Sequence, residues 1–136
     1  MRKILILARE SGTQLELDDI ENDSFLPKSS LAADTVPEFL KTLKLEAEHF
    51  NKIYKKAAAN NCRLKFVAEF DNGKAKVGLQ EIPSDHPFYN LDGSDNIVLF
   101  FTDRYPVQPL IIKGAGAGAD VSVSGLFADI IRIGNN

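Results

Sequence analysis

The sequence is poor in the residue types that build disulfides and metal centres. Its 136 residues include one cysteine, two histidines and no tryptophan. A single cysteine excludes an internal disulfide and suits a reducing cytoplasm. Cys62, His49 and His86 do not have the spacing of metal ligands, so we predict no metal site.

Strong charge and long apolar runs are absent as well. The net charge is −3 and no basic stripe is present, so we expect no nucleic-acid partner. No apolar run approaches the length of a membrane span, and residues 4–8 are too few for a signal peptide. What remains is 44% hydrophobic and 26% charged, as in a globular cytoplasmic protein with one domain over residues 1–136.

Three regions have helical periodicity. Residues 2–10 place apolar side chains on one face, and Gly12 suits the position just after a helix end. Thr35 and Glu38 have capping-box spacing before a helical region that runs to about residue 60, with a possible break at 42–45. A final helix is expected at about 121–133. We expect the last two regions to bury these residues: Leu40, Leu43, Ala47, Phe50, Tyr54, Ala57, Val123, Phe127, Ile130 and Ile131.

The start of the first helix is unusual. No capping residue precedes it, and Arg2 and Lys3 place positive charge at the positive end of the helix dipole. Either the chain has been cut through a longer element, or a cation is needed there for chemistry. The two explanations are compatible. A lysine at this position is a candidate for proton transfer, and the alternative is a solvated terminal side chain.

The strand pattern predicts an α+β fold. Residues 63–70 and 74–82 alternate in hydrophobicity around Asn72-Gly73, a strong hairpin signal. Further strands are expected at 15–20, 96–102 and 110–112, with loops at 22–33 and around Pro106 and Pro109. The sum is a mixed, largely antiparallel sheet covered by helices on one face.

A glycine-rich segment links the last strand to the last helix. Gly114, Gly116 and Gly118 are followed by Asp120, a suitable helix N-cap. The segment is a tightly packed turn, a complete phosphate site, or part of a pocket whose main walls lie elsewhere. A complete dinucleotide site needs a further strand and an acid about 20 residues on, which do not follow here.

Other polar residues give weaker signals. Asp85-His86 lies in a loop and is either an acid–base pair or a surface turn. Lys113 either reaches a phosphate or solvates a strand end. The acidic residues at 18–23 lack the glycine and the spacing of a calcium loop, so a solvated edge is the alternative.

Two segments carry a resemblance to a known family. Residues 2–12, Arg-Lys-Ile-Leu-Ile-Leu-Ala-Arg-Glu-Ser-Gly, resemble the end of the homoserine dehydrogenase signature. Residues 109–129, from Pro-Leu-Ile-Ile-Lys-Gly to Leu-Phe-Ala-Asp, resemble the C-terminal glycine-rich segment of that family. The order and separation of the two segments fit over essentially all of the chain. The wording of residues 8–12 is most similar to bifunctional aspartokinase/homoserine dehydrogenases.

The resemblance implies specific roles. Lys3 matches the lysine that gives a proton to the aldehyde oxygen, and Gly118 matches a glycine that contacts the nicotinamide cofactor. Enzymes of this family reduce aspartate semialdehyde to homoserine with NADPH or NADH, in threonine and methionine biosynthesis. Their middle region supports substrate binding and homodimerisation.

The sequence also departs from the family pattern. The nucleotide-binding domain and the Glu and Asp that hold substrate are expected upstream of Lys3, and Met1 stands where the family usually has Ala. We therefore expect a C-terminal catalytic and dimerisation region that is inactive alone and binds no cofactor by itself. Two alternatives are a stand-alone dimerisation or interaction module and a small-ligand sensor that uses the glycine-rich segment.

Overall fold

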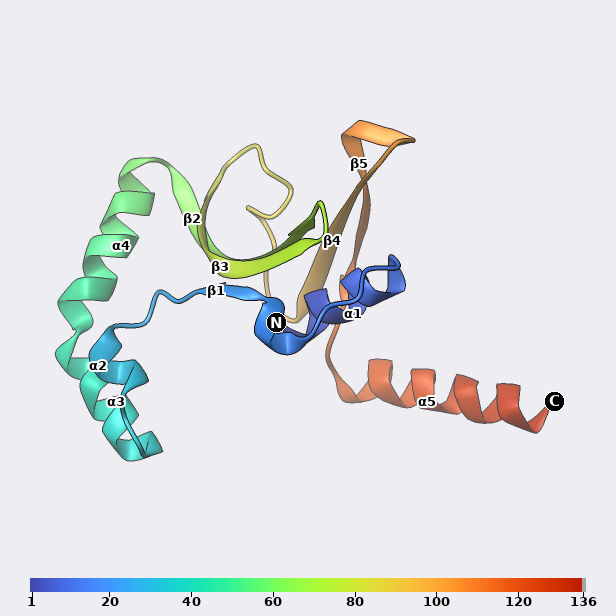
Figure 1. The fold of residues 1–136 in the computed structure, drawn as a ribbon, viewed down its shortest axis with the longest axis horizontal. Helices are drawn as coiled ribbons and strands as arrows, with labels where there is room; N and C mark the ends of the chain where they lie inside the picture. Colours follow the sequence, from blue (N-terminus) through green and yellow to red (C-terminus); the bar gives the residue numbers. More distant parts are fainter. Residues whose placement is uncertain (136) are drawn as a thin grey trace. The chain divides into compact units, whose positions relative to one another are not determined.

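The computed structural model describes residues 1–135, which divide into two compact units, Met1–Tyr89 and Asn90–Asn136 (Figure 1). Each unit has its own sheet. The α+β class, with mixed and mostly antiparallel pairing, is as the sequence predicts. The single-domain organisation stays a prediction. No helix among the described residues has the length and apolar character needed to cross a membrane.

The first unit is built on a three-stranded sheet with the order β1-β3-β2. Strands β2 (Cys62–Asp71) and β3 (Lys74–Pro83) form the predicted antiparallel hairpin. Asn72 and Gly73 have φ of 47° and 76°, the left-handed values of a two-residue turn that matches the strand twist. The short β1 (Glu21–Asp23) pairs parallel with β3.

Helix α1 (Arg2–Glu10) covers one face of this sheet. Its Ile4 is 8% exposed and packs in one cluster with Ile20, Ala75 and Val77. Ala75 and Val77 are two residues apart on β3, so both point to the same face. Gly12 follows the helix end with φ of 93°, and its N–H bonds to the carbonyl of Arg9, as expected.

The segment before β1 corrects one prediction. Residues 15–20 do not form a strand; they contain a 3-10 turn, η1 (Leu17–Asp19). The Asp19 carboxylate accepts a bond from the Glu16 N–H at 2.8 Å, which satisfies a backbone donor locally in place of a strand partner. The expected loop at 22–33 instead holds most of β1 and a short helix, α2 (Lys28–Leu31).

Helices α2, α3 (Val36–Leu45) and α4 (Ala47–Ala59) together form an arm of the first unit. The Thr35 hydroxyl accepts from the Glu38 N–H, and the helical region breaks at Glu46, close to the predicted break. The predicted core stripe is largely wrong, because only Ala57 is buried. Leu40 is 52% exposed and Tyr54 64% exposed, since the described chain places no second layer over them.

The second unit pairs β4 (Asp95–Thr102) with β5 (Tyr105–Ala115) and ends in α5 (Ala119–Gly134). The loop predicted around Pro106 and Pro109 is wrong, because both prolines lie within β5. A two-stranded ribbon has only edge strands, and these tolerate the missing N–H of proline. The register is irregular between Phe100 and Thr102.

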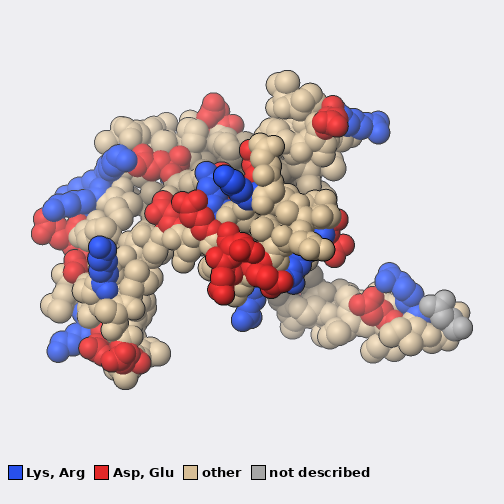
Figure 2. Space-filling model, viewed as in Figure 1, with Lys and Arg blue, Asp and Glu red and all other residues tan. Residues whose placement is uncertain are grey.

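The prediction that the final helix buries an apolar face is wrong. Val123, Phe127, Ile130 and Ile131 were expected in a core, yet each is 49–64% exposed. None of the described residues from Asn90 onward is buried. Helix α5 carries few charges, and Figure 2 shows mostly uncharged atoms along it. An apolar helix with this exposure has surface suited to contact with another protein surface.

Candidate functional site

Lys3 lies in the first turn of α1, at its N-terminal end. Met1 is the N-cap and makes no side-chain capping bond, and the first turn has no acidic residue. Lys3 is exposed, whereas its neighbour Ile4 is buried against the sheet. The lysine is therefore carried on a helix whose position is set by core packing.

The glycine-rich segment combines close packing with an open position. The Gly116 N–H bonds to the carbonyl of Ser94 at 3.1 Å. A Cβ added to Gly116 would collide with the Asn96 side chain, so this position is closely packed. Gly118 differs, because no atom lies within 4 Å of where its Cβ would be.

Gly118, and not Asp120, is the N-cap of α5, which corrects the predicted capping. Its φ of 139° belongs to the region that favours glycine. Asp120 instead lies in the first turn, where its carboxylate complements the helix dipole. Open space beside Gly118 and the free N–H groups of a 16-residue helix are compatible with a close approach by a cofactor.

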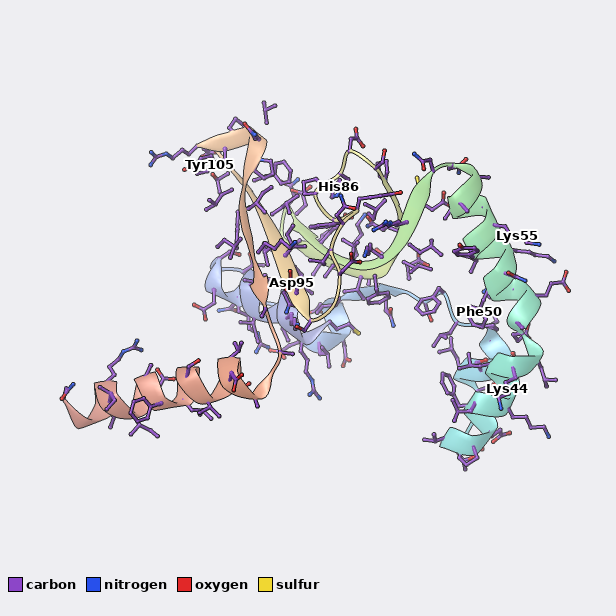
Figure 3. All side chains as sticks on the ribbon, turned by 180° about the vertical axis from the view of Figure 1, so that it is seen from behind. Lys44, Phe50, Lys55, His86, Asp95 and Tyr105 are labelled. Carbon is purple, nitrogen blue, oxygen red and sulfur yellow. The ribbon has the colours of Figure 1, made fainter. Side chains whose placement is uncertain are left out.

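Lys113 forms an ion pair with the neighbouring strand of the ribbon. Its Nζ lies 3.5 Å from Asp95 Oδ2, an ion pair between β5 and β4. Both side chains are part-exposed, so the pair is weakly held. Figure 3 labels Asp95.

The two histidines have structural contacts. His86 Nδ1 accepts from the Phe88 N–H at 3.1 Å, and the rings meet edge to face, as in a surface turn. His49 is exposed on α4, and its Nε2 lies 3.0 Å from the carbonyl oxygen of Phe25. No group of three or more His, Cys, Asp or Glu side chains suited to a metal ion occurs within residues 1–135.

Sequence reasoning missed two charged networks. Lys56 Nζ lies 2.8 Å from Glu81 Oε1, and Asn60 donates to the same carboxylate at 3.1 Å. Glu69 accepts from Gln80 and lies 2.9 Å from Lys76. The hydrogen bond from Gln80, followed by that from Lys76, lowers the pKa of Glu69. The hairpin register places Lys76 opposite Glu69, but it pairs Gln80 with Lys65, so only the Lys76 contact could be predicted from the register.

Roles for Lys3 and Gly118 remain predictions at this point. Lys3 belongs to the first unit and Gly118 to the second, and each unit is described by itself. Both residues have surroundings that suit the roles implied by the resemblance. Lys3 is exposed on a helix that packs against the sheet, and Gly118 has open space around it at the N-cap of α5.

Comparison with known proteins gives consistent matches. The model of the homoserine dehydrogenase family matches residues 1–131. A chloroplastic bifunctional aspartokinase/homoserine dehydrogenase 2 of Zea mays is 42% identical over 97% of the chain. The homoserine dehydrogenase of Saccharomyces cerevisiae is 35% identical over 97% of the chain.

The matched relatives are longer proteins. The chain spans 15% of the Zea mays protein and 37% of the Saccharomyces cerevisiae protein. A crystal structure of a Candida auris protein of unknown function covers 99% of the chain with a TM-score of 0.85 and 41% identity. The chain covers 38% of that structure.

Proposed function

Because the chain belongs to the homoserine dehydrogenase family, we propose that it forms the C-terminal substrate-binding and dimerisation region of an enzyme that interconverts aspartate semialdehyde and homoserine. The expected cofactor is NADP or NAD, and the expected setting is threonine and methionine biosynthesis in the cytoplasm. Two relatives from Zea mays, each 42% identical to the chain, carry the word chloroplastic in their names.

The observation that carries this proposal is the exposed second unit. Phe101, Ile112 and Phe127 are 56–62% exposed, although such side chains normally gain stability by burial. A nucleotide-binding domain and a second copy of the chain would each supply a surface that covers the β4–β5 ribbon and α5. The two-stranded β4–β5 ribbon also has unpaired edges, which favour strand pairing with another copy.

Lys3 is proposed as the proton donor. When bound, the cofactor supplies the hydride that reduces the aldehyde carbon. The Lys3 ammonium gives a proton to the aldehyde oxygen, and the neutral amine is reprotonated from solvent because the side chain is exposed. Gly118 leaves room for the nicotinamide to approach the backbone, which a side chain at that φ would prevent.

The chain alone is expected to give no turnover, because one lysine and one glycine supply neither substrate clamping nor hydride orientation. The test uses the longer enzyme with the change Lys3→Gln. We expect kcat to fall by about 10²–10⁴-fold with a small change in KM, the range of general acid catalysis. Lys28→Gln, a matched change on α2, leaves kcat unchanged.

Equal kcat for Lys3→Gln and Lys28→Gln would exclude the proton-donor role. Turnover by the pure 136-residue chain would exclude the predicted inactivity.

A stand-alone dimerisation module is the second candidate. The exposed apolar ribbon favours it as well, because the ribbon needs no cofactor to pair. Activity of the longer enzyme that depends on Lys3 separates the two candidates.

A further inference from the structure

Helices α3 and α4 of the arm, together with the segment around Phe25, line an apolar groove that the proposed function does not use. Its volume is about 800 Å³. Six of the residues that line it are Phe25, Leu40, Leu43, Lys44, Phe50 and Tyr54. The groove lies within the first unit, so its walls belong to one compact body.

The floor of the groove is held in place by several contacts. The Phe25 ring meets the rings of Phe50 and Phe66 edge to face, at centroid distances of 6.4 and 6.1 Å. The Phe25 carbonyl contacts His49 on α4, 3.0 Å away. These contacts fix the segment against the helix, so a partner would meet a preformed surface and lose little entropy in ordering it.

The shape of the groove suits an elongated partner. Its α4 wall is formed by Ala47, Phe50 and Tyr54, which are three and four residues apart and therefore follow one face of the helix. Leu40 and Tyr54 remain 52% and 64% exposed. An apolar channel along a helix is the surface that receives the apolar face of an amphipathic helix.

The rim of the groove carries unpaired positive charge. Lys44 lines the groove, and Lys55 lies one helical turn after Asn51, another lining residue. Neither lysine forms a hydrogen bond or ion pair within residues 1–135, and Figure 3 shows Phe50 between the two. The nearby carboxylates of Glu46 and Glu48 already contact Ser29 and Lys52.

From these features we propose that the groove binds an amphipathic helix of a partner protein, with acidic residues flanking its apolar face. The apolar face fills the groove, and the acidic flanks pair with Lys44 and Lys55. The charge pairing sets partner choice and association rate more than affinity.

The test uses the 136-residue chain and fluorescence anisotropy at about 50 mM salt, where surface charges are weakly screened. The probe is a labelled helical peptide of about four turns, with leucines on one face and glutamates on both flanks. A second peptide replaces each glutamate by lysine. The acidic peptide should bind about tenfold or more tightly than the basic one, since several surface pairs change sign.

Two variants locate the binding. Lys44→Glu with Lys55→Glu should reverse the preference between the two peptides. Arg2→Glu with Lys74→Glu makes the same change in net charge elsewhere in the first unit and should preserve the preference. Leu40→Asp changes a side chain that is already half exposed, so the fold survives while both peptides lose affinity.

Three results would overturn the proposal. They are no binding of the acidic peptide, equal binding of both peptides, and an unchanged preference in the Lys44→Glu/Lys55→Glu variant. Binding of dodecanoate in place of the acidic peptide would show that the groove takes a single acyl chain, and it would also overturn the proposal.

Discussion

Lys56 Nζ lies 2.8 Å from Glu81 Oε1, and this ion pair joins helix α4 to strand β3. The hydrogen bond from Lys56, followed by that from Asn60, lowers the pKa of Glu81. The same carboxylate raises the pKa of Lys56. Each group therefore holds its charge more firmly in the folded chain than in the unfolded one.

This linkage predicts a loss of stability in acid. Because the folded-state pKa values of Glu81 and Glu69 are lowered, the unfolded chain binds more protons in acid. Their contribution is present above the unfolded carboxyl pKa of about 4.3 and is lost as pH falls through the folded values. Urea midpoints measured between about pH 6 and pH 3 should show the decline.

Glu81→Gln isolates the contribution of this one pair. The gap between the original chain and the variant should be largest at neutral pH and should close in acid. Glu10→Gln, on the exposed side of α1, removes the same charge without breaking an ion pair of the described chain. A Glu81→Gln gap that is constant with pH would contradict the linkage.

Ile4→Ala should destabilise the first unit strongly. The residue is 8% exposed and packs with Ile20 and Val77, so its loss leaves a cavity beneath α1. We expect the free energy of unfolding to fall by about 2–4 kcal/mol. Ile6→Ala, at a 59% exposed position on the same helix, should change it by less than about 0.5 kcal/mol. Urea denaturation compares the two variants. Equal losses of stability would contradict the packing of α1 against the sheet through Ile4.

Gly116→Ala should disturb the second unit. The added methyl collides with the amide end of the Asn96 side chain, which must rotate away, so we expect the free energy of unfolding to fall by less than about 1 kcal/mol. Gly114→Ala is the matched control, because open space surrounds that position in the same segment. Amide hydrogen exchange across β4 and β5 should rise for Gly116→Ala only. Faster exchange for Gly114→Ala as well would point to backbone strain as the cause.

Ile112→Glu tests the proposed dimer. Ile112 is 56% exposed on β5, so a glutamate is tolerated in the monomer but places charge in any interface formed there. Sedimentation should show dimers of the original chain and a dimer dissociation constant raised about tenfold or more by the change. Gln108→Glu adds one charge to the same strand and should leave the equilibrium as it was. Monomers alone at high concentration for the original chain would contradict the dimer.

Local signals in the sequence predicted much of the fold. Asn72-Gly73 specified the β2–β3 hairpin, and Gly12 marked the end of α1, because both depend on backbone conformations that few residues accept. Strand β1 was not predicted, since three residues paired with distant β3 leave no periodic signal. The prediction that α5 is buried was wrong for another reason. An apolar stripe indicates that one face of a helix is buried against something, but it does not say whether the same chain supplies that surface.

Part of the candidate site could likewise be predicted from the sequence, and part depends on residues that are distant in the sequence. Lys3 stands out in the sequence because a cation at an uncapped helix start is locally unfavourable, whereas the role of Gly118 comes only from the resemblance to the family. The open space at Gly118 and the collision at Gly116 depend on neighbours at 94–96. Residue spacing alone makes the two glycines look alike.

The parallel pairing of β1 with β3 also has a consequence for the order of folding. Glu21 and Lys76 are register partners although 55 residues separate them, whereas Asp71 and Lys74 meet across a two-residue turn. Closing the longer loop costs more chain entropy, so the hairpin can form early and β1 must wait. During synthesis Asp23 is made 55 residues before its register partner Gly78, so within this sheet the edge of β3 that receives β1 is covered only after the hairpin has formed.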